Sequence, residues 1–242
     1  MGAKEKDGSE APRGYVNLRG YIVKGIGGFY YVVCRDEDGA ERLVECRARG
    51  KFRKEDVTPL PGDRVGISTL KEEDTGGYVT EIYPRKNQLR RPPVANVDQL
   101  VLVLSAAQPP PDLLLVDKLL VQADREAIAP LIVLNKIDVA EAATRAQVRK
   151  DYRDLPVSFL ELSAVKGDGV QELRSALKGK ISCFAGQSAV GKSSLLNAIS
   201  RHFDFATGEM SKKTGRGRHT TRAVELCSLV GEAESFVMDS PG

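Results

Sequence analysis

The stretch GQSAVGKS at residues 186–193 decides the fold. It fits the pattern G-x4-G-K-[ST], follows the apolar run ISCFA (181–185) and opens the helical stretch SSLLNAIS (193–200). A glycine-bounded loop between a buried strand and a helix lets successive backbone N–H groups point at a phosphate, and the helix N-terminus adds partial positive charge there. The sequence therefore predicts a loop that binds nucleotide phosphates.

Two side chains of this loop have specific expected roles. Lys192 is expected to reach the β- and γ-phosphate oxygens as a point charge and to act in catalysis, and Ser193 is expected to offer its hydroxyl to Mg²⁺. The nucleotide contacts are expected from the whole loop and the start of the helix: Gly186, Gln187, Ser188, Ala189, Val190, Gly191, Lys192, Ser193 and Ser194.

A second motif, Asn135-Lys136-Ile137-Asp138, predicts which base is bound. It follows the apolar run Pro130–Leu134, where a loop leaves the carboxyl end of a strand. A carboxylate at Asp138 can accept hydrogen bonds from the N1–H and the amine of guanine but not from adenine, so it favours guanine. Asn135 is expected to fix the base edge, and the Lys136 stem to cover the base face. Taken alone, the same residues would also suit a helix entry with Asp138 as N-cap.

Two weaker motifs also follow apolar strands. Ser163-Ala164 comes after VSFLEL, and its backbone N–H groups are expected to contact the guanine oxygen. Asp239-Ser-Pro-Gly242 fits D-x-x-G, which predicts that Asp239 holds Mg²⁺ through water and that the Gly242 N–H senses the γ-phosphate.

A basic stretch, KKTGRGRHTTR at 212–222, lies between the phosphate loop and D-x-x-G. Its glycines and its two threonines are typical of a switch that closes on Mg²⁺ and γ-phosphate. Either Thr220 or Thr221 could contact the metal. A basic loop without fixed structure is the alternative.

The C-terminal part of the chain alternates apolar runs with helical stretches, which predicts an α/β domain with a doubly wound, mainly parallel sheet. The runs are VDQLVLVLSA, PLIVLNK, VSFLELSA, ISCFAGQ and SFVMDS, and the expected helices are 112–126, 139–152, 170–177 and 192–202. Towards the N-terminus, five short β-rich stretches separated by Gly and Pro turns predict an OB-like β-barrel, with an SH3-like barrel as the alternative.

The domain boundary is expected in the basic segment RKNQLRRPPVAN (85–96), because Pro92-Pro93 suits neither a helix nor a central strand. The predicted parts are a flexible tail at 1–14, the barrel with its linker at 15–91 and the nucleotide-binding domain at 92–242.

Composition limits the function classes. The 242 residues include 36 Lys plus Arg and 33 Asp plus Glu, a net charge of +3 that is too small for a protein coating nucleic acid over its whole surface. No apolar run approaches the length of about 20 residues that spans a bilayer. The charged N-terminus has no apolar signal segment, and the four cysteines form no CxxC pair. We therefore expect a cytoplasmic protein without membrane contact.

Any nucleic-acid contact must come from a local patch, and the barrel offers one. The cations are Arg42, Arg47, Arg49, Lys51, Arg53 and Lys54. An OB-fold binds RNA by a charged groove with aromatic stacking, so the candidate aromatic residues are Tyr21, Phe29, Tyr30, Tyr31 and Phe52. Each of these aromatics could instead belong to the barrel core.

The order of the motifs is itself informative. The guanine motifs precede the phosphate loop, whereas the common GTPase order begins with that loop, so the domain is a circularly permuted GTPase. Together with RGKFR (49–53), PGDRV (61–65), RPPVANVDQ (91–99) and GRGRHTT (215–221), this order resembles the RsgA (YjeQ) family of bacterial GTPases that act in assembly of the small ribosomal subunit.

The resemblance implies more than the motifs alone. It implies that His219 of the basic stretch acts in GTP hydrolysis, in place of the glutamine that follows D-x-x-G in Ras-like enzymes. Members of the family usually have Gly at the position of Ala189. They also continue past the equivalent of Gly242 into a helical zinc domain, so Zn²⁺ is implied only for a part that is absent from this chain.

The resulting hypothesis is a monomeric GTPase that uses GTP and Mg²⁺, contacts the small ribosomal subunit and its rRNA, and acts late in assembly of that subunit. Slow intrinsic turnover, stimulated by the subunit, is expected. One alternative is an rRNA-binding module switched by nucleotide with negligible turnover. A permuted GTPase of large-subunit assembly is the other, and it is favoured only if the N-terminal region is not a barrel.

Overall fold

The computed structural model describes residues 14–50, 52, 57–71, 76–90, 92–201, 224–229 and 234–239. Contacts divide the chain into two compact units between Arg85 and Lys86. The barrel unit (residues 1–85) and the sheet unit (residues 86–242) are described in turn. Among the described helices, none is long and apolar enough to cross a membrane.

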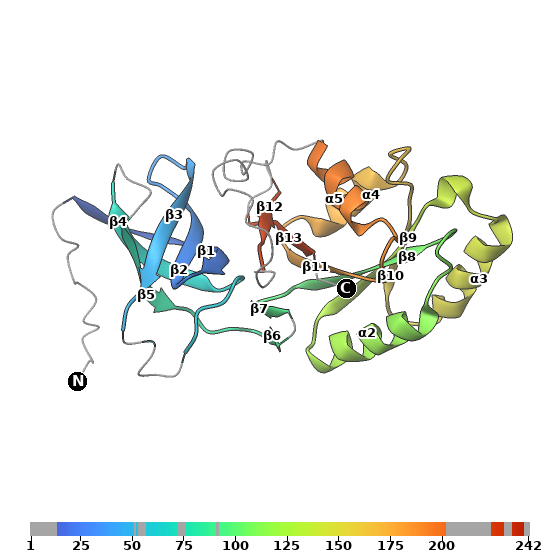
Figure 1. Ribbon diagram of the computed structural model, residues 1–242, viewed down its shortest axis with the longest axis horizontal. Coiled ribbons are helices and arrows are strands. Elements are labelled where there is room, and N and C mark those ends of the chain that lie inside the picture. The colour runs from blue at the N-terminus through green and yellow to red at the C-terminus, as the bar shows by residue number, and fades with distance from the viewer. Residues whose placement is uncertain are drawn as a thin grey trace, which may run out of the picture. The chain divides into compact units, whose positions relative to one another are not determined.

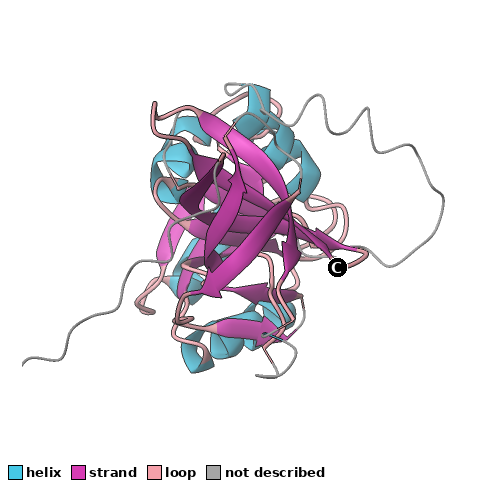
Figure 2. Cartoon of the chain, turned by 90° about the vertical axis from the view of Figure 1, so that its left-hand side faces the viewer, coloured by secondary structure: helices cyan, strands magenta, loops and turns pink. Residues whose placement is uncertain are grey.

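The barrel unit is a closed five-stranded barrel, which confirms the predicted OB-like fold class. Its strands are β1 (Tyr15–Ile26), β2 (Phe29–Arg35), β3 (Glu41–Ala48), β4 (Arg64–Leu70) and β5 (Gly77–Ile82). They follow the order β1-β2-β3-β5-β4, and β1 closes the barrel by pairing with both β2 and β4. The strands of the barrel face the viewer in Figure 2. Strand β1 can pair with two neighbours because it is long and has a register irregularity between Ile22 and Lys24.

Alternating side chains fill the barrel. In β2, Val32 and Cys34 are buried while Arg35 is exposed, the period-two pattern of a strand with one wet face. Ile22, Val44 and Ile67 from the other strands complete the interior. Burial at this density fixes the register of each strand, because a slip of one residue would turn every apolar side chain outwards.

The sheet unit is built on a six-stranded sheet in the order β10-β9-β8-β11-β13-β12. The strands are β8 (Gln99–Ser105), β9 (Ala129–Asn135), β10 (Ser158–Glu161), β11 (Ile181–Ala185), β12 (Cys227–Ser228) and β13 (Phe236–Asp239). All neighbours are parallel except β12, which pairs antiparallel with β13 at the edge. The predicted mainly parallel sheet is therefore confirmed.

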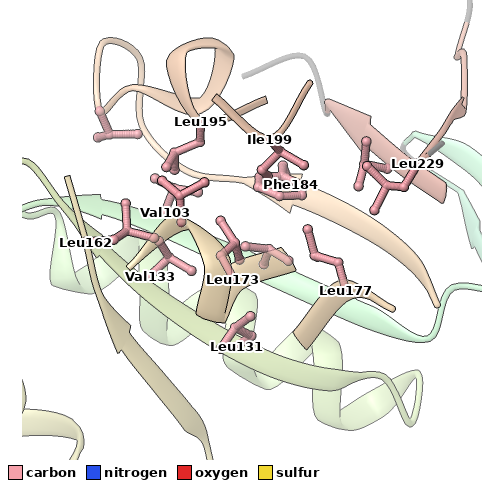
Figure 3. Packing of buried hydrophobic residues seen from close by; sticks show 14 residues of the cluster. Val103, Leu131, Val133, Leu162, Leu173, Leu177, Phe184, Leu195, Ile199 and Leu229 are labelled. Carbon is pink, nitrogen blue, oxygen red and sulfur yellow. The ribbon is translucent and has the colours of Figure 1, made fainter. Parts of the chain in front are cut away.

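Helices cover both faces of this sheet (Figure 1). They are α2 (Leu113–Arg125), α3 (Ala142–Tyr152), α4 (Val170–Leu177) and α5 (Lys192–Arg201). On one face, Leu173 and Leu177 from α4 and Leu195 and Ile199 from α5 pack on Phe184 of β11 (Figure 3). This apolar layer anchors the strand that leads into the phosphate loop.

Three short strands were not expected. The proline-containing segment around residues 85–96 forms a hairpin of β6 (Gln88–Arg90) and β7 (Pro93–Ala95), and β12 was also unexpected. Pro93 is tolerated because each strand of a two-stranded ribbon has a free edge, where the N–H that proline lacks is not needed to pair with another strand. Strands of two or three residues carry too little periodicity to be recognised in a sequence.

Candidate nucleotide-binding site

The expected site residues converge because their strands run in the same direction. The phosphate loop follows β11, the Asn135–Asp138 motif follows β9, and Ser163 and Ala164 follow β10. In a parallel sheet the carboxyl ends of all strands lie at one edge, where loops meet and ligands bind. The sheet order places β9 between β10 and β8, and β8 beside β11, so the three loops are close neighbours.

Two glycines of the phosphate loop are required by its shape. Gly186 has a φ of 148°, and a Cβ there would lie 2.3 Å from the Val103 carbonyl oxygen. Gly191 has a φ of 100°, and a Cβ there would lie 2.4 Å from Asn135 Nδ2. Both positions combine a backbone that L-residues rarely adopt with a contact no side chain can make. The loop therefore depends on glycine at its two ends.

Ala189 is the strained residue of the loop. Its φ is 62°, in the left-handed region that costs a residue with a Cβ roughly 1 kcal/mol or more. The backbone at this position therefore suits glycine, the residue that the resembled family usually has there. The Ala189 carbonyl accepts a hydrogen bond of 2.8 Å from Lys136 Nζ. That bond ties the strained peptide to the base-recognition motif.

Lys192 lies within the loop it was predicted to serve. Its Nζ donates to the carbonyl oxygens of Gly186 (2.7 Å) and Gln187 (3.1 Å). Ser193 and Ser194 are exposed in the first turn of α5, which begins with the Leu195 N–H donating to the Gly191 carbonyl (2.9 Å). An ammonium group and a helix N-terminus thus meet at one loop, which suits an anion.

Asn135 connects three loops. It is 2% exposed, and its Nδ2 donates to the Val190 carbonyl of the phosphate loop (3.0 Å). Its Oδ1 accepts from the Ala164 N–H (3.1 Å) in the loop after β10. A buried amide with both ends bonded resists rotation, because freeing either end leaves an unpaired polar group. Asn135 therefore holds the base and phosphate loops in one arrangement.

Lys136 adds a second link between the same loops. Its backbone is left-handed, with a φ of 65°, and its Nζ donates to the Gln108 carbonyl (2.6 Å) as well as to that of Ala189. These two bonds hold the methylene stem of Lys136 in place. A fixed stem is what the predicted role of covering the base face requires.

The loop after β8 was missed by the sequence reading. Ser105 pairs with Asn135 in the sheet register. The Ser105 hydroxyl accepts a hydrogen bond from the Ala107 N–H (3.1 Å) and donates one to the Gln108 carbonyl (3.3 Å). This turn aims the Gln108 carbonyl at Lys136. The available signal was QPPPD, a loop-forming run at the end of the strand that precedes β9.

Ser163 orients the carboxylate of Asp138, which is predicted to select the base. The buried Ser163 hydroxyl donates to Asp138 Oδ1 (2.7 Å) and accepts from the Lys166 N–H (3.1 Å). Asp138 itself is exposed, so its carboxylate is oriented by the Ser163 hydroxyl and remains open to solvent. A short bond to a charged acceptor fixes the carboxylate more firmly than one between neutral groups.

The N–H groups expected to contact the guanine oxygen have other acceptors. The Ser163 N–H donates to the Asp168 carbonyl (2.9 Å), and the Ala164 N–H donates to Asn135 Oδ1. Ser163 also contacts Asp138 through its hydroxyl, and both residues are thereby tied to the loop after β9. The physical reason is that the loop after β10 closes into its own turn, with the Gly167 N–H donating to the Ser163 carbonyl (2.8 Å).

Helix α3 forms ion pairs with strand β10, the strand that leads to Ser163. Arg145 and Arg149 donate to opposite oxygens of Glu161, the last residue of β10, at distances of 2.5 to 3.1 Å. Burial acts to raise the pKa of Glu161, but the two guanidinium groups outweigh it and lower the pKa below its ordinary value. The ionised pair network therefore persists at neutral pH.

Some predicted residues cannot be placed. His219, Thr220, Thr221 and Gly242 lie outside the described residues. Asp239 is the last residue of β13, next to Phe184 of β11 in register. Within the described ranges, no group of three or more His, Cys, Asp or Glu side chains could hold a metal ion.

Comparisons with known proteins agree with this geometry. A family model described as RsgA GTPase matches residues 82–242, and one described as RsgA N-terminal domain matches residues 19–79. A protein of Caldanaerobacter subterraneus subsp. tengcongensis named small ribosomal subunit biogenesis GTPase RsgA is 47% identical over 225 residues, which are 93% of this chain and 73% of that protein. A protein of Ruminiclostridium cellulolyticum with the same name is 46% identical, over 92% of this chain and 71% of that protein.

Solved structures are similar as well. The crystal structure of YjeQ from Thermotoga maritima matches with a TM-score of 0.75 and 34% identity, covering 94% of this chain and 75% of that one. The structure of YloQ, described as a circularly permuted GTPase, matches with a TM-score of 0.71 and 36% identity, covering 97% of this chain and 74% of that one.

Proposed function

Because the chain belongs to the RsgA GTPase family and is a GTPase, we propose that it hydrolyses GTP to GDP and phosphate during late assembly of the small ribosomal subunit, which stimulates the reaction. The observation that carries the nucleotide part is the Asn135 side chain, which bonds the base loops to the phosphate loop. The relatives named for small-subunit biogenesis support the ribosomal part.

Guanine selection is assigned to Asp138. Its carboxylate is oriented by Ser163 and open to solvent. Guanine offers two adjacent donors to such a carboxylate, whereas adenine presents an acceptor at N1 and leaves the carboxylate unpaired. Lys136, held at its Nζ by two carbonyls, covers the base with its stem.

The phosphate and metal roles follow the chemistry of the donors. Lys192 neutralises phosphate charge, and the exposed Ser193 hydroxyl is an oxygen ligand of the kind Mg²⁺ prefers. These residues fit a nucleotide-bound Mg²⁺, which would stabilise charge on the phosphate oxygens. Asp239, one of Thr220 and Thr221, and the Gly242 N–H complete the proposed set.

Hydrolysis of this kind depends on positioning and charge neutralisation more than on covalent chemistry. We assign His219 to the orientation of the attacking water. Slow turnover is expected until the ribosomal subunit orders the residues around the γ-phosphate. In related GTPases a group supplied to the transition state is worth roughly 10³ to 10⁵ in kcat.

The barrel is the proposed rRNA contact, with some changes to its expected residues. Phe52 is 4% exposed and packs in the barrel core, so its ring is not available for stacking. Arg42 donates to the carbonyls of Lys71 (2.9 Å) and Leu70 (3.3 Å) and thereby secures the barrel. Arg47 lies over the Phe29 ring at 4.8 Å and remains a candidate for RNA contact.

Phosphate release from GTP, measured alone and with purified small subunits, tests the proposal. Large subunits and ATP are the controls. Stimulation by small subunits alone is expected, and His219→Ala should lower the stimulated kcat while leaving GDP affinity unchanged. Tight GTP binding without stimulated turnover would contradict the proposal in favour of a nucleotide-switched binding module. Stimulation by large subunits instead would contradict the small-subunit assignment.

A further inference from the structure

One tyrosine on the outside of the barrel has two arginines at its ring. The guanidinium carbon of Arg19 in β1 lies 5.8 Å from the centroid of the Tyr83 ring, and that of Arg64 in β4 lies 5.9 Å from it. Tyr83 directly follows β5, and its N–H continues the sheet by donating to the Arg64 carbonyl (2.9 Å). Three neighbouring strands therefore contribute to this arginine–tyrosine cluster, defined as Arg19, Arg64 and Tyr83.

The Tyr83 side chain extends from the end of β5 towards β4. In the barrel register Gly66 of β4 lies beside Arg19 of β1 and beside Glu81 of β5. A Cβ added at Gly66 would be 3.7 Å from the Tyr83 hydroxyl oxygen, an ordinary van der Waals distance. The phenol hydroxyl therefore lies near Gly66, with Arg19 opposite on β1 and Arg64 two residues earlier on β4.

The two arginines of this cluster place two positive charges at one aromatic ring. Arg19 and Arg64 are both exposed, and among the described residues neither forms an ion pair with a carboxylate. Glu81 is the acid that the strand register brings to this face, and within the described part of the chain it forms no ion pair with either arginine. Two guanidinium groups at one ring repel each other, and a phosphate that bridges them would remove the repulsion through charge-assisted hydrogen bonds.

We propose that the arginine–tyrosine cluster binds single-stranded RNA, with a base on Tyr83 and backbone phosphates on Arg19 and Arg64. The inference rests on the proposed function, since it adds a contact for the same rRNA partner. It concerns strands β1, β4 and β5, whereas OB-folds commonly bind oligonucleotides on the face of strands 2 and 3. In this barrel that other face carries the Phe29–Arg47 pair.

Fluorescence anisotropy of the full chain with a labelled 12-nucleotide oligouridine tests the site. The double variant Arg19→Gln/Arg64→Gln should bind at least about tenfold more weakly and reduce the slope of log K against log salt by about 1 to 2. Tyr83→Leu should weaken binding by roughly 5- to 100-fold, whereas Tyr83→Phe, which keeps the ring, should bind like the unmodified chain.

A matched control removes the same charge elsewhere on the barrel. Arg35→Gln/Lys71→Gln takes away two exposed cations from other positions and should leave binding within about twofold. Equal loss in both double variants, no loss in the Arg19/Arg64 variant, or no RNA binding by the unmodified chain would each overturn the site. Binding of an acidic peptide in preference to the RNA would overturn it too.

The failure of this inference can be told apart from the failure of the proposed function. All variants should keep the basal GTP turnover of the unmodified chain, because none of the substituted residues belongs to the sheet unit. If small subunits stimulate the unmodified chain but the cluster variants bind RNA normally, the cluster assignment is wrong and the proposed function stands. If small subunits have no effect on the unmodified chain, the proposed function fails first.

Discussion

The base side and the phosphate side of the site are built by different means. On the base side, the side chains of Asn135, Lys136 and Ser163 make the contacts that shape the loops. On the phosphate side the backbone sets the shape, through positive φ at Gly186, Ala189 and Gly191. Substitutions on the base side should therefore remove single hydrogen bonds, whereas substitutions on the phosphate side should change the path of the chain.

The strongest test of this difference is Gly191→Ala. The new methyl group would meet Asn135 Nδ2 at 2.4 Å in a backbone region that disfavours it, so both sides of the site must shift. We expect GDP affinity to fall by about a hundredfold or more, measured with a fluorescent GDP analogue. Gly179→Ala is the control, because Gly179 has a φ of 67° but nothing within 4 Å of the added Cβ. Similar losses in both variants would show that backbone strain alone matters.

Asp138→Asn alters the base side without changing its shape. An amide can accept one bond from guanine but presents a donor where guanine also donates, so GTP affinity should fall by about a hundredfold. Xanthosine triphosphate, which carries an oxygen in place of the guanine amine, should become the preferred nucleotide. Competition titrations measure both effects. A parallel loss for every nucleotide would mean that Asp138 supports the loop and does not read the base.

Ser163→Ala removes the hydroxyl that orients Asp138 and leaves the rest of the turn in place. A hydrogen bond to a charged group contributes about 1.5 to 3 kcal/mol, part of which water can replace at the exposed carboxylate. We expect GDP affinity to decrease by roughly tenfold, with the ratio of GDP to ADP affinity falling as well. Ser158→Ala, at an exposed position of β10, should change neither quantity.

The smallest effect is expected from Ala189→Gly on the phosphate side. Removing the Cβ relieves the left-handed strain at φ 62°, which should raise the melting temperature slightly and tighten GDP binding by up to about fivefold. Ala127→Gly, at a φ of 52° away from the loop, should raise stability alone. If Ala189→Gly weakens binding, the alanine methyl group has a role in the site that strain does not describe.

Elements with long, buried apolar runs were predictable. The helix expected at 170–177 is α4 with the same bounds, and the helix expected at 112–126 is α2 at Leu113–Arg125. Their apolar faces repeat with the helical period and continue into buried contacts such as Leu173 and Leu177. The hairpin of β6 and β7 was not predictable, since three-residue strands in a segment with two prolines have no such repeat.

Contacts between side chains that are distant in the sequence were harder to predict than the motifs. Ser163 was predicted to act through its N–H, whereas in the structure this N–H donates to the Asp168 carbonyl and the hydroxyl donates to Asp138. Phe52 stands among cations in the sequence, and yet its ring packs in the barrel core. A local pattern describes neighbours along the chain, whereas these roles depend on residues such as Asp138 and Val79 that are distant in sequence.

By itself, the sequence determined that the chain has a glycine-bounded phosphate loop, a guanine-type motif at a strand end and a permuted order of the two, because each depends on local spacing. Only the tertiary structure decided that Asn135 and Lys136 hold the phosphate loop through the carbonyls of Val190 and Ala189, and that Gln108 completes this link. The reason is that these contacts join loops 25 to 55 residues apart, such as Ser163 with Asp138 and Asn135 with Val190, and only the strand order of the folded sheet brings those loops together.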